Sequence, residues 1–524
     1  MMKSTTLLLG ICTLFVMSCK QVQPTTETEA YYAEPYRPQF HFSPQEKWMN
    51  DPNGMFYYNN EYHLFYQYYP DSTVWGPMHW GHAVSKDLVY WEHLPIALFP
   101  DEDGYIFSGS AVVDWKNTSG LGKDGQPPLI AIFTSHNAEQ EKAGRIDFQA
   151  QSIAYSNDNG RTWTKYPDNP VLKNPGIRDF RDPKVSWHEA TQQWIMTLAA
   201  QDHIAFYASP DLKNWTHQSD FGKDRGAHGG VWECPDLFPL QIAGTDQTKW
   251  VLLVSINPGG PNGGSATQYF IGNFDGKTFT SDDSASTTLW MDYGRDNYAG
   301  VTWSDVPRED GRRLLIGWMS NWQYAQVVPT ERWRSAMTVS RELTLQNTPA
   351  GLRLVSKPVK ELEQLRAKTS PVAAQAITGT VDITPQLGFA PTQMEAVLEF
   401  ELSGDSLVNI GIELGNTKGE VYRIGYNAGA KTFYSDRTKA GKADFSELFN
   451  DKVTIAPRWI NSNTVQLHLF FDKMSAELFA DGGATVITDL YFPNEDYRQV
   501  KLFAENGTAQ LKKATFYQLK SIWQ

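Results

Sequence analysis

Five segments of the chain share one plan, and this repetition constrains the fold more than any other feature of the sequence. Each segment starts with a polar or acidic residue, continues as an apolar strand, turns, and returns as a second apolar strand. Similar hairpins at the spacing of a four-stranded unit are typical of β-propellers, in which each repeat forms one blade. We therefore predict a five-bladed β-propeller over residues 38–345, with an irregular all-β array as the alternative. The five starting residues are Asp51, Ser108, Asp182, Glu233 and Asp296.

The repeat plan also predicts where chemistry takes place. In a propeller whose units each begin with the innermost strand, the entrances of all five units converge on one end of the central channel. Asp51, Asp182 and Glu233 would then face one another, although they lie far apart in the sequence. Three acids at matching positions of three repeats indicate a site built on carboxylates.

The sequence pattern changes after about Arg341. The stretch from Leu352 to Arg366 mixes Glu with Lys and Arg, which favours a connector with a short helix, and we expect a linker over residues 346–369. Beyond it apolar residues recur with period two, as in Leu398, Phe400 and Leu402. Half-buried strands of this kind form β-sandwiches. The predicted fold class is all-β, a five-bladed propeller followed by a β-sandwich over residues 370–524.

The N-terminus has the composition of an export signal. Lys3 supplies a positive charge, an apolar run extends from Leu7 to Met17, and a small residue stands directly before Cys19. This order resembles a bacterial lipobox, which implies a signal peptide over residues 1–18, a lipid on the Cys19 sulfur and a flexible tether over residues 19–37. An ordinary secretory signal cut near the same place is the alternative. The apolar run is short for a membrane span.

Cysteine usage and charge narrow the classes of function. Of three Cys, only Cys234 would remain in the folded body, so we expect neither an intrachain disulfide nor a zinc cluster, and no cofactor is implied. The formal net charge is −13 and no basic block is present, which argues against nucleic acid and against membrane contact other than through the lipid. The 18 Trp offer flat faces on which sugar rings stack. A neutral substrate is expected, and the oligomeric state stays open.

Two of the acids lie in segments that suit paired carboxylate chemistry. Asp51 lies in the segment WMNDPNG, where Pro and Gly impose a tight turn and amide groups can donate to an ionised carboxylate. Glu233 lies in the segment VWECP among apolar neighbours, which would raise its pKa and suit a general acid. A retaining glycosidase needs such a pair about 5 to 5.5 Å apart. Each segment alone also fits a turn or a buried structural group.

Five short motifs follow one another along the chain. They are WMNDPNG at 48–54, FSGS at 107–110, RDP at 181–183, WECPD at 232–236 and RDNYA at 295–299. Their order and spacing resemble the motif set of glycoside hydrolase family 32, which includes invertases, inulinases and levanases. The resemblance covers nearly the whole chain after residue 38, and the combination is far more specific than any one motif.

The resemblance implies a double displacement on β-linked fructofuranosides such as levan, inulin and sucrose, without a metal. We favour the release of terminal fructose, because the axis of a propeller readily makes a closed-ended funnel. Asp51 matches the nucleophile, Glu233 the acid/base, and Asp182 the residue that stabilises the transition state. Arg181 beside Asp182 would keep that carboxylate charged. The residues that would line the pocket for the terminal fructose are Asn50, Gln67, Trp75, Phe107, Ser108, Arg181, Asp296 and Trp318.

Other interpretations of the same motifs stay open. An endo-acting levanase would need loops that leave an open groove, and the shape of loops is not disclosed by one sequence. A catalytically silent fructan-binding lipoprotein would not need all three acids, which are present. An enzyme for other furanosides, such as arabinan, would not be expected to carry both WMNDPNG and WECPD. The preference among levan, inulin and sucrose, and a periplasmic or cell-surface location, are also undecided.

Overall fold

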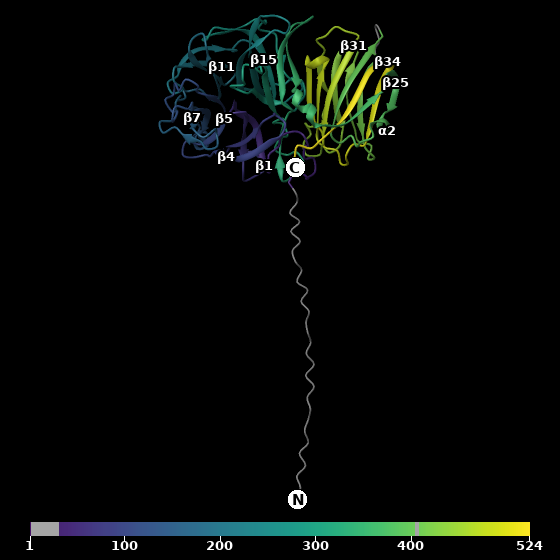
Figure 1. Ribbon diagram of the computed structural model, residues 1–524, viewed down its shortest axis with the longest axis horizontal. Helices are drawn as coiled ribbons and strands as arrows, with labels where there is room; N and C mark the ends of the chain where they lie inside the picture. The colour runs from purple at the N-terminus through teal and green to yellow at the C-terminus, as the bar shows by residue number, and fades with distance from the viewer. Residues whose placement is uncertain (2–30, 404–407, 524) are drawn as a thin grey trace.

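The computed structural model describes residues 1, 31–403 and 408–523 of the chain. Figure 1 shows two β-rich domains side by side, the first coloured from purple to green and the second from green to yellow. Cys19 and, apart from Met1, the whole predicted signal peptide lie outside the described residues. In the part of the chain that is described, no helix has the length and hydropathy that a bilayer crossing requires.

The first domain is a five-bladed propeller, which confirms the prediction. Blade one contains β1 (Lys47–Tyr58), β2 (Glu61–Tyr69), β3 (His79–Ser85) and β4 (Trp91–Leu98). Blade two contains β5 (Tyr105–Val113), β6 (Leu129–His136), helix α1 (Ala138–Lys142), β7 (Gln149–Ser156) and β8 (Thr164–Lys165). Blade three contains β9 (Phe180–His188), β10 (Gln193–Ala200), β11 (His203–Ser209) and β12 (Thr216–Phe221).

The last two blades are less regular than the first three. Blade four contains β13 (Val231–Gln241), β14 (Thr248–Asn257), β15 (Ala266–Phe274), β16 (Phe279–Ser281) and β17 (Leu289–Trp290). Blade five contains β18 (Tyr298–Thr302), β19 (Arg313–Met319), β21 (Ala336–Met337), β22 (Arg341–Thr348) and β23 (Gly351–Pro358). In both blades a short additional strand pairs away from the main order of the sheet.

The first strand of every blade lies next to the central axis. Strands β1, β5, β9, β13 and β18 contact one another in a closed ring. Because these strands all begin at the same end of the channel, residues near their starts converge there, as the repeat plan predicts. Asp51, Ser108, Asp182 and Glu233 lie on the first four inner strands, and Asp296 lies just before the fifth.

A short strand from the fifth blade closes the ring of blades. Strand β20 (Trp333–Arg334) pairs in parallel with the start of β1, so it extends the sheet of the first blade. An isolated bridge between Phe56 and Ser304 adds a second link between the same two blades. Closure of this kind leaves no open edge between the first and last repeats.

The change of domain falls within the range 346–369 that was expected to be a linker, but most of this range is regular structure. Gly351–Pro358 is strand β23, because Leu352 and Leu354 alternate with period two and pack against the core of the fifth blade. The helical connector is the short 3-10 helix Lys360–Leu365, and β24 (Arg366–Val372) already belongs to the second domain. The proposed linker at 346–369 is therefore a strand, one 3-10 turn and the start of another strand.

The second domain has the sandwich-like architecture that the sequence predicts. The long strand β34 pairs first with β27 and then with β26, so it runs through both halves of the domain. Leu398 and Phe400 of one half share a buried cluster with Ile410 and Ile412 of the other half. The strands are β25 (Gln375–Asp382), β26 (Met394–Leu402), β27 (Asn409–Gly415), β28 (Val421–Asn427), β29 (Thr432–Lys439), β30 (Thr454–Pro457), β31 (Thr464–Asp472), β32 (Ser475–Ala480), β33 (Thr485–Leu490) and β34 (Gln499–Leu519); the helices are α2 (Thr384–Leu387) and the 3-10 turn Asp481–Gly483.

The predicted tether is packed against the body of the protein from residue 31 onward. The Tyr32 ring stacks on Trp523 with a centroid distance of 3.8 Å. Arg37 is fully buried and donates hydrogen bonds to Glu34 and to the backbone oxygen of Pro44 at 2.6 Å. Aromatic side chains and a paired guanidinium therefore fix a segment whose polar composition suggested flexibility.

Buried ion pairs join the two domains. Arg341 of β22 contacts Asp292 at 3.0 Å and Glu477 of β32 at 2.5 Å. His41 lies between Asp472 and Glu477 at 2.8 Å from each; burial alone would lower its pKa, but these carboxylates raise it to about 9. Removing one partner from such a cluster leaves an uncompensated charge, which costs about 3–5 kcal/mol. The pairs therefore fix how the domains meet.

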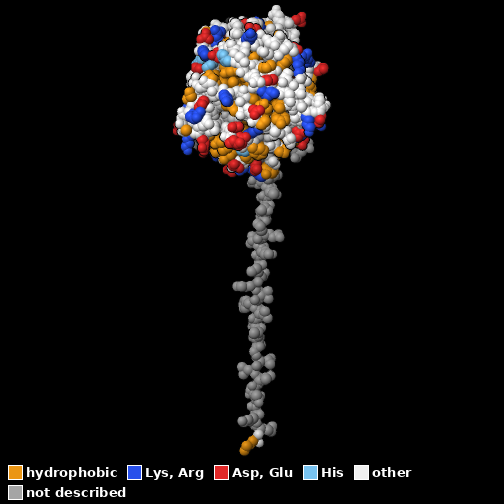
Figure 2. Space-filling model, turned by 90° about the vertical axis from the view of Figure 1, so that its left-hand side faces the viewer, with side chains coloured by type: hydrophobic (Ala, Val, Ile, Leu, Met, Phe, Trp, Pro, Cys, Tyr) orange, Lys and Arg blue, Asp and Glu red, His pale blue; other side chains and the backbone are white. Residues whose placement is uncertain are grey.

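The propeller surface carries charges of both signs. Figure 2 shows the side of the molecule that lies at the left in Figure 1, where Lys and Arg side chains are interspersed with Asp and Glu. Hydrophobic side chains gather among them in small areas. This face has no region that one sign of charge dominates, although the net charge of the chain is −13. Such a face fits a neutral ligand.

Candidate active site

The three predicted carboxylates line one pocket at the end of the central channel. Asp51, Asp182 and Glu233 surround a cavity of about 280 Å³. They come from β1, β9 and β13, the inner strands of the first, third and fourth blades. The structure therefore brings together residues from three different blades.

A local irregularity in every inner strand accompanies the site. The register of the ladder shifts between Met49 and Pro52 in β1, between Ile106 and Gly109 in β5, between Glu233 and Asp236 in β13, and between Tyr298 and Val301 in β18; β9 shifts opposite Thr197 and Ala199 of β10. Asp182 and Cys234 have positive φ values of 66° and 46°. Such bulges bend a strand and re-aim its side chains. The site is therefore built by deviations from regular strands.

Asp51 accepts hydrogen bonds on both carboxylate oxygens. Asn50 Nδ2 donates to Oδ1 at 3.1 Å, and Ser108 Oγ and Cys234 Sγ donate to Oδ2 at 2.9 and 3.5 Å. Burial raises the pKa of Asp51 above its usual range, and the charge of Glu233 raises it further, while the three hydrogen bonds act in the opposite direction. The expected donors are present, but they do not outweigh burial.

Glu233 is held by one cation and one phenol. Arg181 donates to Oε1 through Nε and Nη2 at 3.2 and 2.9 Å, and the Tyr298 hydroxyl donates to Oε2. The apolar neighbours in sequence do not enclose this carboxyl, because Trp232 points into the core of the fourth blade and Cys234 points toward Asp51. Burial and the charge of Glu233 raise the pKa of Tyr298 well above its usual value, so the phenol remains a donor.

Asp182 differs from its prediction. Burial raises its pKa to about 7, and the nearby Glu233 and Asp51 charges oppose the lowering effect of Arg181. The Arg181 guanidinium lies 4.0 Å from Asp182 but 2.6 Å from Asp179 and 2.9 Å from Glu233. Arg181 does favour the charged form of Asp182, as expected, but burial and the two neighbouring carboxylates outweigh it, because the guanidinium lies closer to Asp179 and Glu233.

Most of the predicted substrate-binding residues line the same pocket. Trp75 and Phe107 form an aromatic wall with ring centroids 6.0 Å apart. Gln67 is oriented by a hydrogen bond from its Nε2 to the Ile106 backbone oxygen at 3.0 Å. The predicted residues that border the cavity are Asn50, Gln67, Trp75, Phe107, Ser108 and Arg181, together with the three acids.

Two predicted pocket residues lie elsewhere. Asp296 is fully buried at the domain interface, where its carboxylate accepts hydrogen bonds from Arg437 at 2.6 Å and from Tyr324 at 2.7 Å. Trp318 is also fully buried and packs between Trp48 and Trp322. Neither borders the cavity, because the second domain covers Asp296 and the Trp322 ring lies between Trp318 and the pocket.

Several residues that border the pocket were not predicted. His136 stacks on Phe107 with a centroid distance of 4.1 Å, and Asp179 orients Arg181. Their positions follow from contacts between blades, and the sequence carries no local signal for them. The only available hint was that Asp179 stands two residues before the RDP motif. The further residues that border the cavity are Glu141, Gln149, Trp322 and Gln326.

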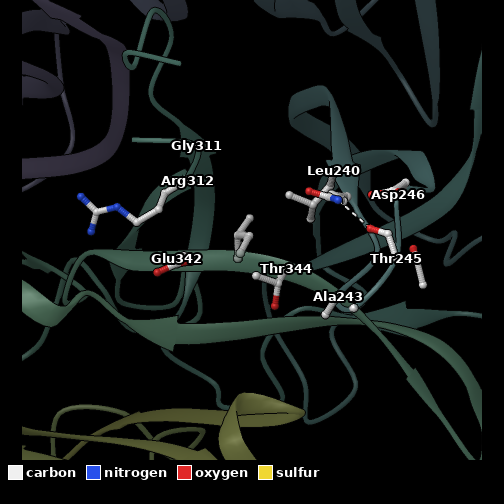
Figure 3. A pocket seen from close by; sticks show the side chains of 11 residues that line it. Leu240, Ala243, Thr245, Asp246, Gly311, Arg312, Glu342 and Thr344 are labelled. Carbon is white, nitrogen blue, oxygen red and sulfur yellow. Dashed lines mark hydrogen bonds between the residues drawn. The ribbon is translucent and has the colours of Figure 1, made fainter. Parts of the chain in front are cut away.

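A second cavity, of about 410 Å³, contains none of the predicted residues (Figure 3). Leu240 and Thr245 lie on one side of it, and Arg312 extends away from them on the other. The Arg312 guanidinium is already paired with Asp310 at 2.6 Å and with Glu361 at 2.8 Å. The Arg312 guanidinium, the main cation at this cavity, is therefore already paired within the protein. Among the described residues, no group of three or more His, Cys, Asp or Glu side chains is arranged to hold a metal ion.

Two family models match the chain in succession. The model of the Glycosyl hydrolases family 32 N-terminal domain matches residues 41–358, and the model of the Glycosyl hydrolases family 32 C terminal matches residues 361–518. The chain belongs to glycosyl hydrolase family 32. The junction between the two models coincides with the end of β23.

The family 32 chain is similar to known proteins over most of its length. It is 49% identical over 503 residues to a levanase of Bacillus subtilis, covering 94% of this chain and 72% of that protein. It is 39% identical over 519 residues to an extracellular exo-inulinase of Aspergillus awamori, covering 94% of this chain and 96% of the relative.

Solved structures give the same family. The crystal structure of exo-inulinase from Aspergillus awamori has a TM-score of 0.85 at 36% identity, covering 94% of this chain and all of the other. A structure of fructofuranosidase from Schwanniomyces occidentalis complexed with fructose has a TM-score of 0.81 at 33% identity, covering the same shares. This family 32 member is a glycoside hydrolase.

The raised pKa of Asp182 predicts a pH-dependent effect of Asp182→Asn on stability. A carboxyl whose pKa is raised from 3.8 to about 7 favours folding while it keeps its proton, and this contribution is lost as the pH rises through 7. The variant cannot ionise, so its Tm should rise relative to the wild type between pH 4 and pH 8. Thermal unfolding followed by circular dichroism measures this difference. The exposed loop substitution Asp124→Asn is the control, and a Tm difference for Asp182→Asn that is independent of pH would contradict the assignment.

Proposed function

We propose that this family 32 member is an extracytoplasmic β-fructosidase that releases terminal fructose from fructans and sucrose with retention of configuration. The observation that carries the proposal is the convergence of Asp51, Asp182 and Glu233 on one pocket. It is supported by the family, in which a levanase and exo-inulinases are among the similar proteins, and in which related structures contain fructose and fructosyl-erythritol.

In the proposed first step, Asp51 attacks C2 of the terminal fructose while Glu233 gives its proton to the glycosidic oxygen. The C2–O bond to the leaving group breaks and a fructosyl ester of Asp51 forms. Because the charge of Glu233 raises the pKa of Asp51, a proton on Glu233 favours the ionised Asp51 that attack requires. In the second step Glu233 takes a proton from water, and the water attacks C2 and frees Asp51.

The surroundings of Glu233 suit this exchange of roles. The Tyr298 hydroxyl and the Arg181 guanidinium contact different oxygens of the carboxyl, so they fix its orientation in both steps. A carboxyl that must first donate and then accept a proton at one position benefits from such a fixed geometry.

Asp182 is proposed to bind hydroxyl groups of the fructose ring. Its Oδ2 accepts the Cys234 backbone N–H at 3.0 Å, and no described residue donates a hydrogen bond to its Oδ1. This free oxygen can accept a sugar hydroxyl, and the bond strengthens when positive charge develops at the anomeric carbon. A pKa of about 7 also allows the carboxyl to share a proton with that hydroxyl near neutral pH.

The size of the pocket supports removal of single fructose units. A cavity of about 280 Å³ lies just below the usual 300–1,000 Å³ of small-ligand pockets, so it suits one terminal sugar rather than an internal stretch of polymer. The Trp75 and Phe107 rings form one wall. An endo-acting levanase would need a groove open at both ends. A silent binding protein would not need the carboxylate pair with its polarised surroundings.

The first functional prediction concerns the two carboxylates of the reaction. Asp51→Ala and Glu233→Ala should each lower kcat for sucrose by about 1,000-fold or more, while circular dichroism remains that of the wild type. Azide, a small nucleophile, should give fructosyl azide of inverted configuration with Asp51→Ala and of retained configuration with Glu233→Ala. Glu141→Gln, at the rim of the same pocket, is the matched control and should lose less than 10-fold. Turnover like that of the wild type in either alanine variant would end the proposal.

The second functional prediction concerns the products. Double displacement releases β-fructose first, and proton NMR of the reaction detects this anomer before mutarotation. Chromatography of a levan digest should give free fructose without intermediate oligosaccharides. First appearance of the α anomer would exclude double displacement, and an early ladder of oligosaccharides would replace exo action with endo action.

The location of the enzyme is proposed from its N-terminal sequence and its relatives. The exo-inulinases among the similar proteins are extracellular, and Cys19 follows a run with the composition of a lipoprotein signal. A lipid on Cys19 would hold the propeller at a membrane through the following segment. Growth with radioactive palmitate should label the protein, and Cys19→Ser should abolish the label without lowering activity in the soluble fraction. A protein that carries no label would leave an exported but unanchored enzyme.

A further inference from the structure

The largest of the described cavities lies at the end of the propeller channel that faces away from the carboxylates. It has a volume of about 890 Å³. Its lining includes residues at or near the ends of four inner strands: Val113 of β5, His188 of β9, Pro239 of β13 and Thr302 of β18. Along β9, His188 stands six residues after Asp182 of the catalytic pocket, about 20 Å further along the strand, and the two cavities share no lining residue. The cavity is therefore distinct from the catalytic pocket.

Two indole side chains at this cavity are presented in fixed positions. Trp115 is 61% exposed, yet its Nε1 donates to Asp305 at 2.9 Å and its ring packs beside Tyr58 at 5.7 Å. Trp187 packs against Trp194 at 5.2 Å and donates from Nε1 to Glu189 at 2.7 Å. A large exposed apolar ring that is held rigid loses little entropy when a ligand stacks on it.

The floor of the cavity carries polar groups that the protein does not satisfy. No described residue accepts a hydrogen bond from the Arg313 guanidinium, which lies 5.0 Å from the Phe238 ring. Asp236 is 1% exposed; its Oδ2 accepts two hydrogen bonds from Thr302, but its Oδ1 has no partner among the described residues. The Asp236 oxygen is enclosed by the protein, whereas the partly exposed Arg313 guanidinium can gain a hydrogen bond from a ligand.

The charges around the cavity nearly cancel. Four side chains contribute positive charge and three contribute negative charge: Lys116, Lys184, Arg308 and Arg313, against Glu189, Asp236 and Asp305. Lys184 is moreover engaged with Asp236 at 3.4 Å and with the Thr302 backbone oxygen at 2.5 Å. A phosphate or another anion would meet carboxylates here, so a neutral ligand with several hydroxyl groups fits better.

We propose that this cavity is a second saccharide site, which binds a stretch of fructan through stacking on Trp115 and Trp187 and through hydroxyl contacts to Arg313. The choice of fructan rests on the proposed function, because the polymer is the neutral saccharide that the catalytic pocket would recruit. Hydroxyl groups can accept from the guanidinium, and the C–H faces of a sugar pack on indole rings.

A second site changes the kinetics on polymer and leaves those on small substrates alone. A fructan held at the far end of the propeller keeps its other chain ends at a raised local concentration near the catalytic pocket. Sucrose with its fructose in the catalytic pocket is too small to reach the far end of β9, about 20 Å away. The proposal therefore predicts that the second site lowers KM for levan and leaves KM for sucrose unchanged.

The kinetic test uses the full chain with Trp115→Ala and with Arg313→Gln. Both variants should raise KM for levan about 5- to 10-fold, while kcat and KM for sucrose stay within about 2-fold of the wild type. Phe99→Ala, which removes another exposed aromatic ring outside the described pockets, is the matched control and should change neither. An unchanged KM for levan in both variants overturns the second site. Loss of sucrose and levan hydrolysis in the wild type itself would instead overturn the proposed function.

A binding test separates the second site from a general loss of structure. Calorimetric titration of the full-length Asp51→Ala chain with an inulin oligosaccharide should give two sites. Adding Arg313→Gln should leave one site, and a Tm within a few degrees of that of Asp51→Ala excludes unfolding as the cause. One site in both proteins would contradict the proposal.

Discussion

The site depends on a break in the regular pairing of each inner strand. A regular strand turns successive side chains to opposite faces, so an unbroken ladder would aim a carboxylate along the plane of its blade or into a neighbouring blade. The register shifts in β1, β5, β9, β13 and β18 bend each strand near the same end of the channel. Positive φ values at Asp182 and Cys234 belong to the same deviations. The packed blades around these positions keep the strained backbone conformations in place.

The convergence of three acids creates an electrostatic problem that one guanidinium only partly solves. Asp51 and Asp182 both have raised pKa values, because burial and neighbouring carboxylates disfavour their charged forms. Arg181 reaches Glu233 and Asp179 rather than Asp182. Burial and the neighbouring carboxylates therefore favour retention of protons on Asp51 and Asp182, whereas attack by Asp51 requires that its own carboxyl is ionised.

The second domain makes buried contacts with the propeller, which the composition of the predicted linker did not suggest. It covers Asp296 through Arg437, and it holds Arg341 through Glu477. These contacts lie next to the fifth blade. The inner strand of this blade, β18, is short and supplies Tyr298 to the site. The proposed sugar site lies at the other end of the same channel. The central channel of a propeller has two ends, and in this chain each end carries polar groups that lack a hydrogen-bond partner among the described residues.

The sequence by itself determined the five-fold repeat, the all-β class and the identity of the three acids, because hydrophobic period and turn residues are local and the motifs are contiguous. Four further pocket residues, Asn50, Phe107, Ser108 and Arg181, stand within those motifs, and the resemblance to the family added Gln67 and Trp75. Only the tertiary structure decided that Asp296 and Trp318 lie outside the pocket, that His136 and Asp179 lie within it, and that Arg181 is aimed away from Asp182. These outcomes depend on which blade or domain covers a side chain and on where the ladder shifts. Such long-range contacts leave no periodic trace in the sequence, and pKa values follow from them, because burial and the distance between charges exist only after folding.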